Sequence, residues 1–300
     1  MIKSQFTLKQ LEAFVFVVDI GTFRGAATAL GTTQPNVSAR IKALEEALGK
    51  TILVRDAGSV RLTESGEVLL QKARDVLWAG EALIEEAERQ DLIDERLRLG
   101  VTELVACSWL REFLRLLKEA YPNLRIELEV DLSVAIDLLL REGKLDLALQ
   151  TEPFPTQISG TEHLVHENYC WVTVPDIAQH LGAKPALDDL FEYPILTHAK
   201  HSLATRSLHQ IAEERGLNVG RIAHSNALSA CVPMVTEGLG IALLPHALVR
   251  SEIKSGALQV IETDWLPDAL SFHARYHADR APLYVQKAVE FAKQAIKQDS

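Results

Sequence analysis

Small and amide side chains gather on one face of a predicted helix near the N-terminus. Apolar residues mark the opposite, buried face, because they step by four, three and four positions: Val37, Ile41, Leu44 and Leu48. Amides can pair with the edge of adenine, and an alanine can contact the thymine methyl group; such contacts read sequence in the major groove. The residues that we expect to meet double-stranded DNA here are Thr33, Gln34, Pro35, Asn36, Ser38, Ala39, Arg40 and Lys42.

Two earlier segments would position this helix. Thr7 and Gln10 fit a capping box at the start of a first helix, which Gly21 ends. Thr22 can cap a second, short helix, and Gly31-Thr32-Thr33 then makes a tight turn in which Thr33 caps the third helix. Two short helices joined by a glycine-containing turn form a helix-turn-helix, whose second helix lies in the major groove.

A short hairpin is predicted after the three helices. Strand-forming residues at 52–55 and 60–62 flank Asp56-Ala57-Gly58-Ser59, which suits a tight connection. We expect this hairpin to be a wing along the DNA backbone or minor groove. Arg40, Lys42, Arg55 and Arg61 can reach phosphates, and about four such contacts in each of two copies predict a steep salt dependence of binding.

A long helix capped by Thr63 is predicted to run to about Gln90. Small and apolar positions in it alternate spacings of four and three, which is typical of a two-stranded coiled coil. A glycine there costs helix stability and suits two backbones that approach closely. We expect this helix to join copies of the chain; the alternative is a surface helix packed on its own domain. The seam consists of Leu69, Ala73, Val76, Gly80, Leu83 and Ala87.

Predicted strands alternate with predicted helices from Leu97 onward, which favours an α/β fold with largely parallel sheets. The series occurs twice, so we expect two lobes with a ligand between the carboxyl ends of their strands. The expected strands are 96–101, 125–130, 145–150, 169–174, 194–197, 221–223, 241–244 and 271–276, and the expected helices are 104–120, 134–142, 202–215, 227–237 and 283–298.

Ordered motifs run densely from Phe6 to Gly66 and more loosely to the end of the chain. They include Leu11-Glu12-Ala13-Phe14, Ala26-Ala27-Thr28-Ala29-Leu30, Thr33-Gln34-Pro35-Asn36-Val37-Ser38, Leu62-Thr63-Glu64-Ser65-Gly66, Glu142-Gly143-Lys144-Leu145-Asp146 and Glu237-Gly238-Leu239-Gly240-Ile241. In these motifs the chain resembles the LysR-type transcriptional regulators.

The resemblance implies a DNA-binding, ligand-responsive transcription factor that acts as a homodimer or homotetramer, with RNA polymerase as a further partner. It implies a winged helix-turn-helix module (1–66), all-α apart from its wing, then a dimerising linker helix (67–90) and an effector-binding domain (91–300). That domain would be a periplasmic-binding-protein-like α/β sensor with two lobes. Lobe one would take about 91–165 and 270–300, and lobe two about 166–269.

The resemblance also assigns DNA contacts, to Gln34, Pro35, Ser38 and Arg55. Many members of the family place a base-reading arginine directly after this serine, whereas Ala39 stands there in this chain. Arg40 follows about 100° further round the helix. We therefore expect Arg40 to grip a phosphate.

Polar residues in the loops that leave the predicted strands are the candidates for effector contact, because amides at the N-termini of the following helices favour anions. Ser133 and Ser225 are also good helix caps, whatever binds nearby. An ionised Glu103 in the cleft would disfavour a plain carboxylate and favour a ligand with an amine or hydroxyl donor; facing solvent, it would select nothing. The candidates are Thr102, Glu103, Ser133, Gln150, Thr151, Thr197, His198, Ser225 and Asn226.

Composition narrows the remaining possibilities. The chain has 300 residues, enough for about two domains, and no apolar run of the length that spans a bilayer. The net charge is −10, although the first 66 residues carry eight basic and six acidic side chains, a charge asymmetry that hints at an interaction module. Three scattered cysteines argue against a disulfide framework and favour a reduced, cytoplasmic compartment.

Other chemistries are not supported by the sequence. Gly238-Leu239-Gly240 follows a helix and precedes a strand, the reverse of the phosphate-binding order, and neither a P-loop nor a nucleophile elbow occurs. We expect no catalytic residues, no cofactor and no metal. The alternative function is an enzyme or a solute-binding protein with a structural N-terminal appendage, in which case residues from Asp91 onward would retain full function.

Overall fold

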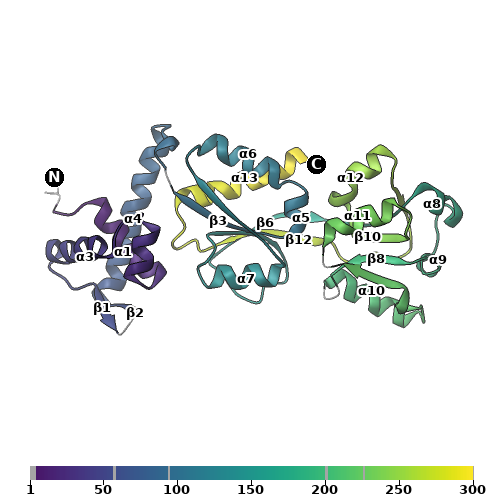
Figure 1. The fold of residues 1–300 in the computed structure, drawn as a ribbon, viewed down its shortest axis with the longest axis horizontal. Helices are drawn as coiled ribbons and strands as arrows, with labels where there is room; N and C mark the ends of the chain where they lie inside the picture. The colour runs from purple at the N-terminus through teal and green to yellow at the C-terminus, as the bar shows by residue number, and fades with distance from the viewer. Residues whose placement is uncertain (1–4, 57–58, 94, 200–201, 226, 300) are drawn as a thin grey trace. The chain divides into compact units, whose positions relative to one another are not determined.

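The computed structural model describes residues 5–56, 59–93, 95–199, 202–225 and 227–299, which form two compact units (Figure 1). The first unit comprises Met1–Glu95, Tyr121–Asn123 and Ala278–Lys287. The second unit comprises Arg96–Ala120, Leu124–His277 and Ala288–Ser300.

Three short helices build the core of the first unit: α1 (Leu8–Ile20), α2 (Phe23–Ala29) and α3 (Gln34–Leu48). They begin and end as the sequence predicts. The Gln10 side chain accepts a hydrogen bond from Thr7 N (2.7 Å), and Gly21 ends α1 in the left-handed conformation at φ 77°. Their apolar faces close on one core, in which Phe14, Val37 and Leu44 are almost fully buried.

A two-stranded hairpin, β1 (Leu53–Asp56) with β2 (Ser59–Leu62), follows α3 and forms the predicted wing. The wing is fastened at its base, where Thr63 Oγ1 donates to Thr51 O (2.8 Å) and accepts from Gly66 N (2.9 Å). Gly66 is required at this point, because a Cβ atom would lie 2.1 Å from Ile52 O.

The long helix α4 spans Glu64–Glu86, and a short 3₁₀ turn, η1, spans Gln90–Leu92. The helix ends earlier than the predicted Gln90, because the chain turns at Glu88 with a φ of 53°. The first seam residues, Leu69 and Ala73, pack into the core of their own unit. For this part of the helix the alternative prediction, a surface helix packed on its own domain, is therefore confirmed. Further along, Val76 and Leu83 are exposed, the latter to 71%.

The second unit contains two sheets of five strands each, in the orders β4-β3-β5-β12-β6 and β11-β7-β10-β8-β9. The first sheet consists of β3 (Arg96–Val101), β4 (Arg125–Val130), β5 (Leu147–Thr151), β6 (Gly160–Glu167) and β12 (Leu270–Tyr276). The second consists of β7 (Tyr169–Thr173), β8 (Ile195–His198), β9 (Ile222–Ser225), β10 (Ile241–Pro245) and β11 (Gln259–Ile261).

Helices cover both sheets, with α6 and α13 on one face of the first sheet and α7 on the other (Figure 1). They are α5 (Glu103–Cys107), α6 (Leu110–Ala120), α7 (Ser133–Arg141), α8 (Pro175–Leu181), α9 (Leu187–Leu190), α10 (Leu203–Glu214), η2 (Val219–Arg221), α11 (Leu228–Thr236), α12 (His246–Ser255) and α13 (Leu283–Asp299). The single helix predicted over 104–120 is broken, because Ser108 leaves helical geometry and its hydroxyl donates to Leu104 O (2.6 Å).

Four of the five described strands in each sheet run in the same direction, so the prediction of largely parallel sheets is confirmed for all but one strand of each. Within the described residues each sheet is mixed: β12 runs antiparallel to both β5 and β6, and β7 runs antiparallel to both β10 and β11. The chain crosses from the first sheet to the second between β6 and β7 and returns between β11 and β12, and of these four strands only β7 and β12 run opposite to the rest of their sheets. The sequence analysis missed two of these strands, β6 and β11.

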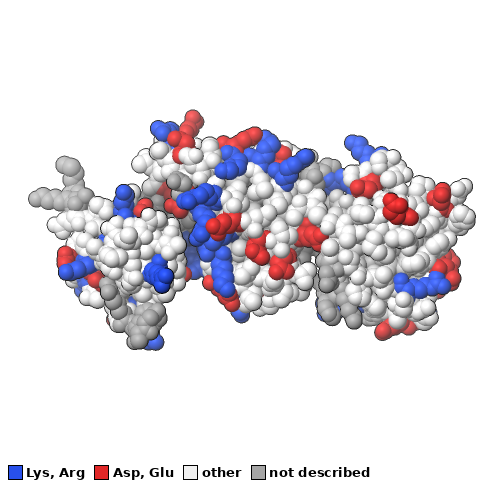
Figure 2. Space-filling model, viewed as in Figure 1, with Lys and Arg blue, Asp and Glu red and all other residues white. Residues whose placement is uncertain are grey.

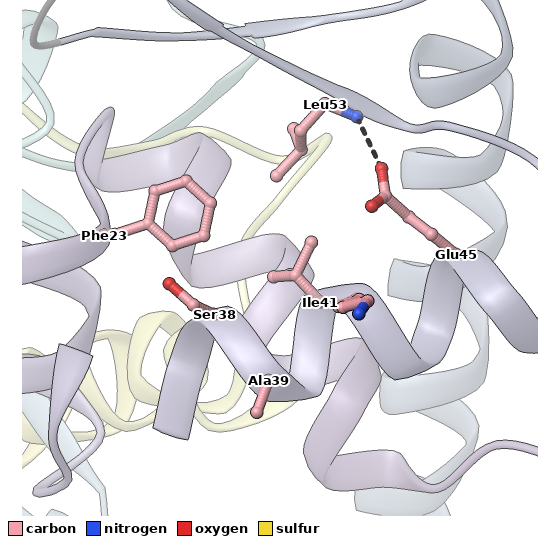
Figure 3. A pocket seen from close by; sticks show the side chains of 7 residues that line it. Phe23, Ser38, Ala39, Ile41, Glu45 and Leu53 are labelled. Carbon is pink, nitrogen blue, oxygen red and sulfur yellow. Dashed lines mark hydrogen bonds between the residues drawn. The ribbon is translucent and has the colours of Figure 1, made fainter. Parts of the chain in front are cut away.

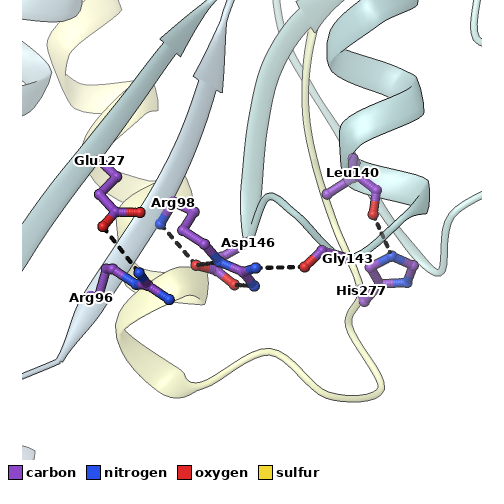
Figure 4. Close-up of polar contacts among 7 residues, drawn as sticks. All are labelled: Arg96, Arg98, Glu127, Leu140, Gly143, Asp146 and His277. Carbon is purple, nitrogen blue, oxygen red and sulfur yellow. Dashed lines mark hydrogen bonds and ion pairs between the residues drawn. The ribbon is translucent and has the colours of Figure 1, made fainter. Parts of the chain in front are cut away.

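Polar contacts fix the amino ends of the strands in the first sheet (Figure 4). Arg98 Nη2 pairs with Asp146 Oδ1 (2.5 Å), and Arg98 Nη1 donates to Gly143 O (2.6 Å). Arg96 Nη1 reaches Glu127 Oε1 (3.1 Å) across the neighbouring strands. These contacts lie at the opposite end of the sheet from the candidate effector residues, which follow the carboxyl ends of the strands.

Candidate functional site

The predicted outward face of α3 is open to solvent. Six of the proposed DNA-facing residues are exposed, and Ser38 and Arg40 are half-buried; the exposed ones are Thr33, Gln34, Pro35, Asn36, Ala39 and Lys42. Thr33 occupies the cap position of α3, but its side chain accepts no backbone hydrogen bond, contrary to our expectation of a capping hydroxyl. The polar face of this helix is therefore accessible to a partner.

An open pocket lies beside this face, where α2, α3 and β1 meet (Figure 3). In Figure 3, the Ser38 hydroxyl lies toward Phe23, whereas the Ala39 methyl group projects from another side of α3. Lys42 also lines the pocket and forms an exposed ion pair with Glu46 (3.7 Å). Such exposed pairs are weak, so this ammonium group can exchange its partner for a phosphate at little cost.

Glu45 connects the recognition helix to the wing and was missed by the sequence analysis. One carboxylate oxygen accepts from Ile52 N (2.9 Å). The same oxygen accepts from Leu53 N (3.4 Å), where the chain enters β1 (Figure 3). Ile52 is fully buried, so its amide has no water as an alternative partner. Glu45 therefore holds the wing in register with α3.

The wing presents Arg61 to solvent, and its register places Arg61 opposite the exposed Val54. Arg55 lies in β1 opposite Val60, but its side chain is outside the described residues. In the view of Figure 2, basic side chains are dispersed over the winged module. The described basic side chains of the module, Arg40, Lys42 and Arg61, are thus at least partly accessible to solvent.

The first lobe is built around the first sheet. Its candidate effector residues lie after β3 (Thr102 and Glu103), at the end of β5 (Gln150 and Thr151) and at the start of α7 (Ser133). Ser133 Oγ lies 2.9 Å from Thr151 Oγ1 and accepts from Thr151 N (3.1 Å). Gln150 is fully buried, with its amide oriented toward Ser133 O (3.1 Å) and Arg275 Nη1 (2.9 Å). The structure therefore brings Ser133 and Thr151 together and places Gln150 behind them.

Arg275 itself forms a buried ion pair with Asp137 of α7, and its guanidinium lies 4.1 Å from the centre of the Phe154 ring. Both charged groups are almost completely buried. This pair fixes α7 against β12.

In the second lobe, Thr197 and His198 end β8, and Ser225 ends β9. Thr197 is 2% exposed and its hydroxyl lies 3.0 Å from Thr205 Oγ1. Ser225 Oγ accepts from Ala227 N (3.1 Å) in a turn before α11. The prediction that Ser133 and Ser225 cap helices is wrong, because the cap residues of α7 and α11 are Leu132 and Ala227. Burial lowers the pKa of the half-buried His198 from its usual value of 6.5, although the nearby Glu103 carboxylate acts in the opposite direction. Asn226 lies outside the described residues.

Glu103 joins the two lobes. Its carboxylate accepts hydrogen bonds from Leu228 N (2.6 Å), Ser229 N (3.1 Å) and Ser229 Oγ (2.8 Å) at the start of α11. Partial burial acts to raise the pKa of Glu103, but these hydrogen bonds outweigh it, so the pKa is lower than usual. Glu103 is thus ionised at neutral pH and does not simply face solvent.

Other candidate chemistries find little support in the described part of the chain. Burial raises the pKa of Cys170 to about 12 and that of Cys231 to about 11, and partial burial raises the pKa of the exposed Cys107. The described His, Cys, Asp and Glu side chains include no group of three that could hold a metal ion. Among the described helices, none is both long enough and apolar enough to cross a membrane.

Comparison with known families decides the identity. Residues 90–297 match the LysR substrate binding domain, and residues 8–67 match the bacterial regulatory helix-turn-helix protein, lysR family. The chain belongs to the LysR family of transcriptional regulators. It is a DNA-binding transcription regulator with an effector-binding C-terminal domain, not an enzyme, and the resemblance and fold class inferred from the sequence are confirmed.

Individual LysR-type relatives match most of the chain. A probable hydrogen peroxide-inducible genes activator of Streptomyces viridosporus is 35% identical over 263 residues, which cover 85% of this chain and 83% of that protein. The regulator BenM of Acinetobacter baylyi is 28% identical over 79% of this chain and 80% of its own length.

Solved structures show the same fold. A full-length OxyR variant from Pseudomonas aeruginosa superposes with a TM-score of 0.60 at 23% identity, covering 98% of this chain and 99% of that one. Full-length LysG from Corynebacterium glutamicum, solved with its effector Arg bound, gives a TM-score of 0.56 at 21% identity over 97% and 99% of the two chains.

Proposed function

We propose that this LysR-type regulator reads a specific operator through α3 and the wing, and that a small metabolite bound between its two lobes controls that activity. The observation that carries the proposal is the exposed polar face of α3, which includes Lys42 and the half-buried Arg40, together with the exposed Arg61 on the wing. Amide and small side chains on this face suit base edges, and the flanking cations suit phosphates. DNA is in the cytoplasm of a bacterial cell, so we place the protein there.

Gel-shift titration with the intergenic DNA upstream of the gene tests this function. We expect nanomolar-range binding at low salt and a steep loss of affinity as salt rises. Ser38→Ala should reduce the preference for the operator over unrelated DNA, because it removes one hydrogen bond near the bases. Absence of retention at low salt would contradict the proposal, and so would full function of a chain that begins at Asp91.

We propose further that α4 joins two copies of the chain. Val76 and Leu83 lie seven residues apart on the exposed part of the helix, and a Cβ atom at Gly80 between them would meet no atom within 4 Å. A dimer would place two α3 helices on two half-sites, and a pair of dimers would give a tetramer. RNA polymerase is the further partner that we propose for the DNA-bound form.

Leu83→Glu tests the role of α4. A charge at this seam should shift the oligomer toward monomer and weaken operator binding by at least about tenfold, since each half-site would be bound alone. Sedimentation velocity measures the mass, with Glu86→Gln as a control on the same helix turn. An unchanged mass for Leu83→Glu would exclude this seam.

The effector of this chain is proposed to contact the Ser133–Thr151 pair and the polar groups at the ends of β3, β8 and β9: Thr102, Glu103, Gln150, Thr197, His198, Ser225 and Asn226. The bound Arg in the LysG structure supports a small polar ligand in this fold. The peroxide response named for the Streptomyces relative is not proposed here, because the raised pKa values of all three thiols disfavour the reactive thiolate.

A further inference from the structure

Helix α11 lies where the second lobe meets the first, and it has no side-chain cap of its own. Its cap residue is Ala227, which carries no acceptor for the first amides of the helix. Helix α10 in the same lobe is different, since Ser202 Oγ accepts from Thr205 N at 3.2 Å. The amides that open α11 therefore need an acceptor from elsewhere in the molecule.

Glu103 supplies this acceptor from the other lobe. It is the first residue of α5, directly after β3, and it is 125 residues from Leu228 in the sequence. Both of its oxygens are engaged, by two backbone amides and the Ser229 hydroxyl. A carboxylate that accepts several charge-assisted hydrogen bonds at a helix N-terminus takes the position that such sites offer to a bound anion.

We propose that Glu103 is a built-in anion of the effector cleft, which clasps the first lobe to the second and takes the place that an acidic effector would use. This inference rests on the proposed function, because it concerns the same cleft. It makes Glu103 a residue that determines effector specificity as well as lobe closure.

The ligand class follows from the chemistry around Glu103. A second carboxylate would be repelled by the first and would find the α11 amides already bonded. An ionised carboxylate can only accept, so a ligand beside it must offer N–H or O–H donors. Thr102 Oγ1 and His198 Nδ1 are buried polar atoms for which the described residues provide no partner, and both suit a neutral polar group. The effector is therefore a neutral or cationic molecule on the side that faces Glu103.

Chemical rescue tests the built-in anion in the full-length protein. Glu103→Ala removes the carboxylate and leaves its place open, Glu103→Gln removes the charge but keeps the place filled, and Glu112→Ala removes a surface carboxylate from α6. Each protein is titrated with sodium acetate into the hundreds of millimolar, against sodium chloride at equal ionic strength. Hydrogen exchange of the peptide that contains Leu228 and Ser229 reports the site directly, and the thermal midpoint reports the whole protein.

We expect Glu103→Ala to lose at least about tenfold in protection at these two amides and to regain it with acetate in a saturable manner. Wild type, Glu103→Gln and Glu112→Ala should show no acetate effect beyond that of chloride. Circular dichroism of Glu103→Ala and Glu103→Gln establishes that both are folded.

Three results would overturn the inference: unchanged protection in Glu103→Ala, no recovery with acetate while the variant is folded, or the same acetate response in wild type. The proposed function fails by a different result, since loss of operator binding by the wild-type protein does not depend on acetate. The two failures are therefore distinguishable.

Discussion

The contact between Glu45 and the base of the wing gives the sharpest test of how the DNA-reading unit is held together. Glu45→Ala removes an acceptor that serves Ile52 N at 2.9 Å and Leu53 N at 3.4 Å. A hydrogen bond to a charged acceptor contributes about 1.5–3 kcal/mol, and the Ile52 amide would be left buried without a partner. We therefore expect the wing to loosen by about 2 kcal/mol.

A loosened wing must be ordered again when DNA binds, so the same free energy is lost from affinity. At 1.4 kcal/mol for each factor of ten, about 2 kcal/mol weakens operator binding by roughly thirtyfold. Glu46→Ala is the matched control, because it removes the same charge one position along α3. The Glu46 partner is Lys42, in an exposed pair at 3.7 Å, so its loss costs about 0.5 kcal/mol or less.

Fluorescence anisotropy with labelled operator DNA measures both affinities at several salt concentrations. Both variants lose one negative charge near the DNA, so a purely electrostatic effect would change them equally. Hydrogen exchange at Ile52 and Leu53 reports whether the wing has loosened in Glu45→Ala alone. Equal affinities and equal exchange for Glu45→Ala and Glu46→Ala would refute the role of Glu45 in positioning the wing.

Three further perturbations follow from described contacts. Arg61→Ala should weaken binding to all DNA sequences and lower the salt slope by about one unit, and an unchanged slope would exclude this wing contact. Burial at the start of α13 raises the pKa of Glu81 from 4.5 to about 7, so ionisation costs about 3 kcal/mol of stability. Urea unfolding should therefore show the free energy of unfolding falling as pH rises from about 4.5 to 7. Glu81→Gln should flatten this pH dependence, and an unchanged profile in this variant would contradict the role of Glu81. Asp137→Ala should lower stability by about 3–5 kcal/mol, because Arg275 stays buried without its partner; a loss below about 1 kcal/mol would contradict this.

Local signals in the sequence were enough to predict the winged module. Capping residues, helix-ending glycines and the apolar spacing of Val37, Ile41 and Leu44 act within a few residues, so they can be read without knowing the fold. The exposed face of α3 follows directly from this spacing. The strand order of the lobes was harder to predict from the sequence. Strand β6 is an edge strand of alternating exposed residues, and its pairing with β12 joins residues more than 100 positions apart.

The functional contacts that the sequence analysis missed depend on how the elements pack, which helix and strand periodicity do not reveal. The hydrogen bonds from the wing to Glu45 depend on the turn after α3, which brings Ile52 and Leu53 back to the helix. Glu103 was an ambiguous charge in the sequence, because its partners at α11 lie on the other lobe. Gln150 was predicted at the end of a strand, beside a loop that could contact the effector. In the structure its side chain is buried and its amide faces Arg275.

The two crossings between the lobes have a consequence for the architecture. Glu167, where the chain leaves the first sheet, is the register partner of Leu270, where it returns. The intervening 102 residues, from Asn168 to Ala269, thus begin and end at adjacent positions, in the manner of a domain inserted into a hairpin. A two-residue turn joining β6 to β12 would give a minimal first lobe, and the excised portion could be exchanged between relatives to graft one half of a ligand specificity onto another regulator.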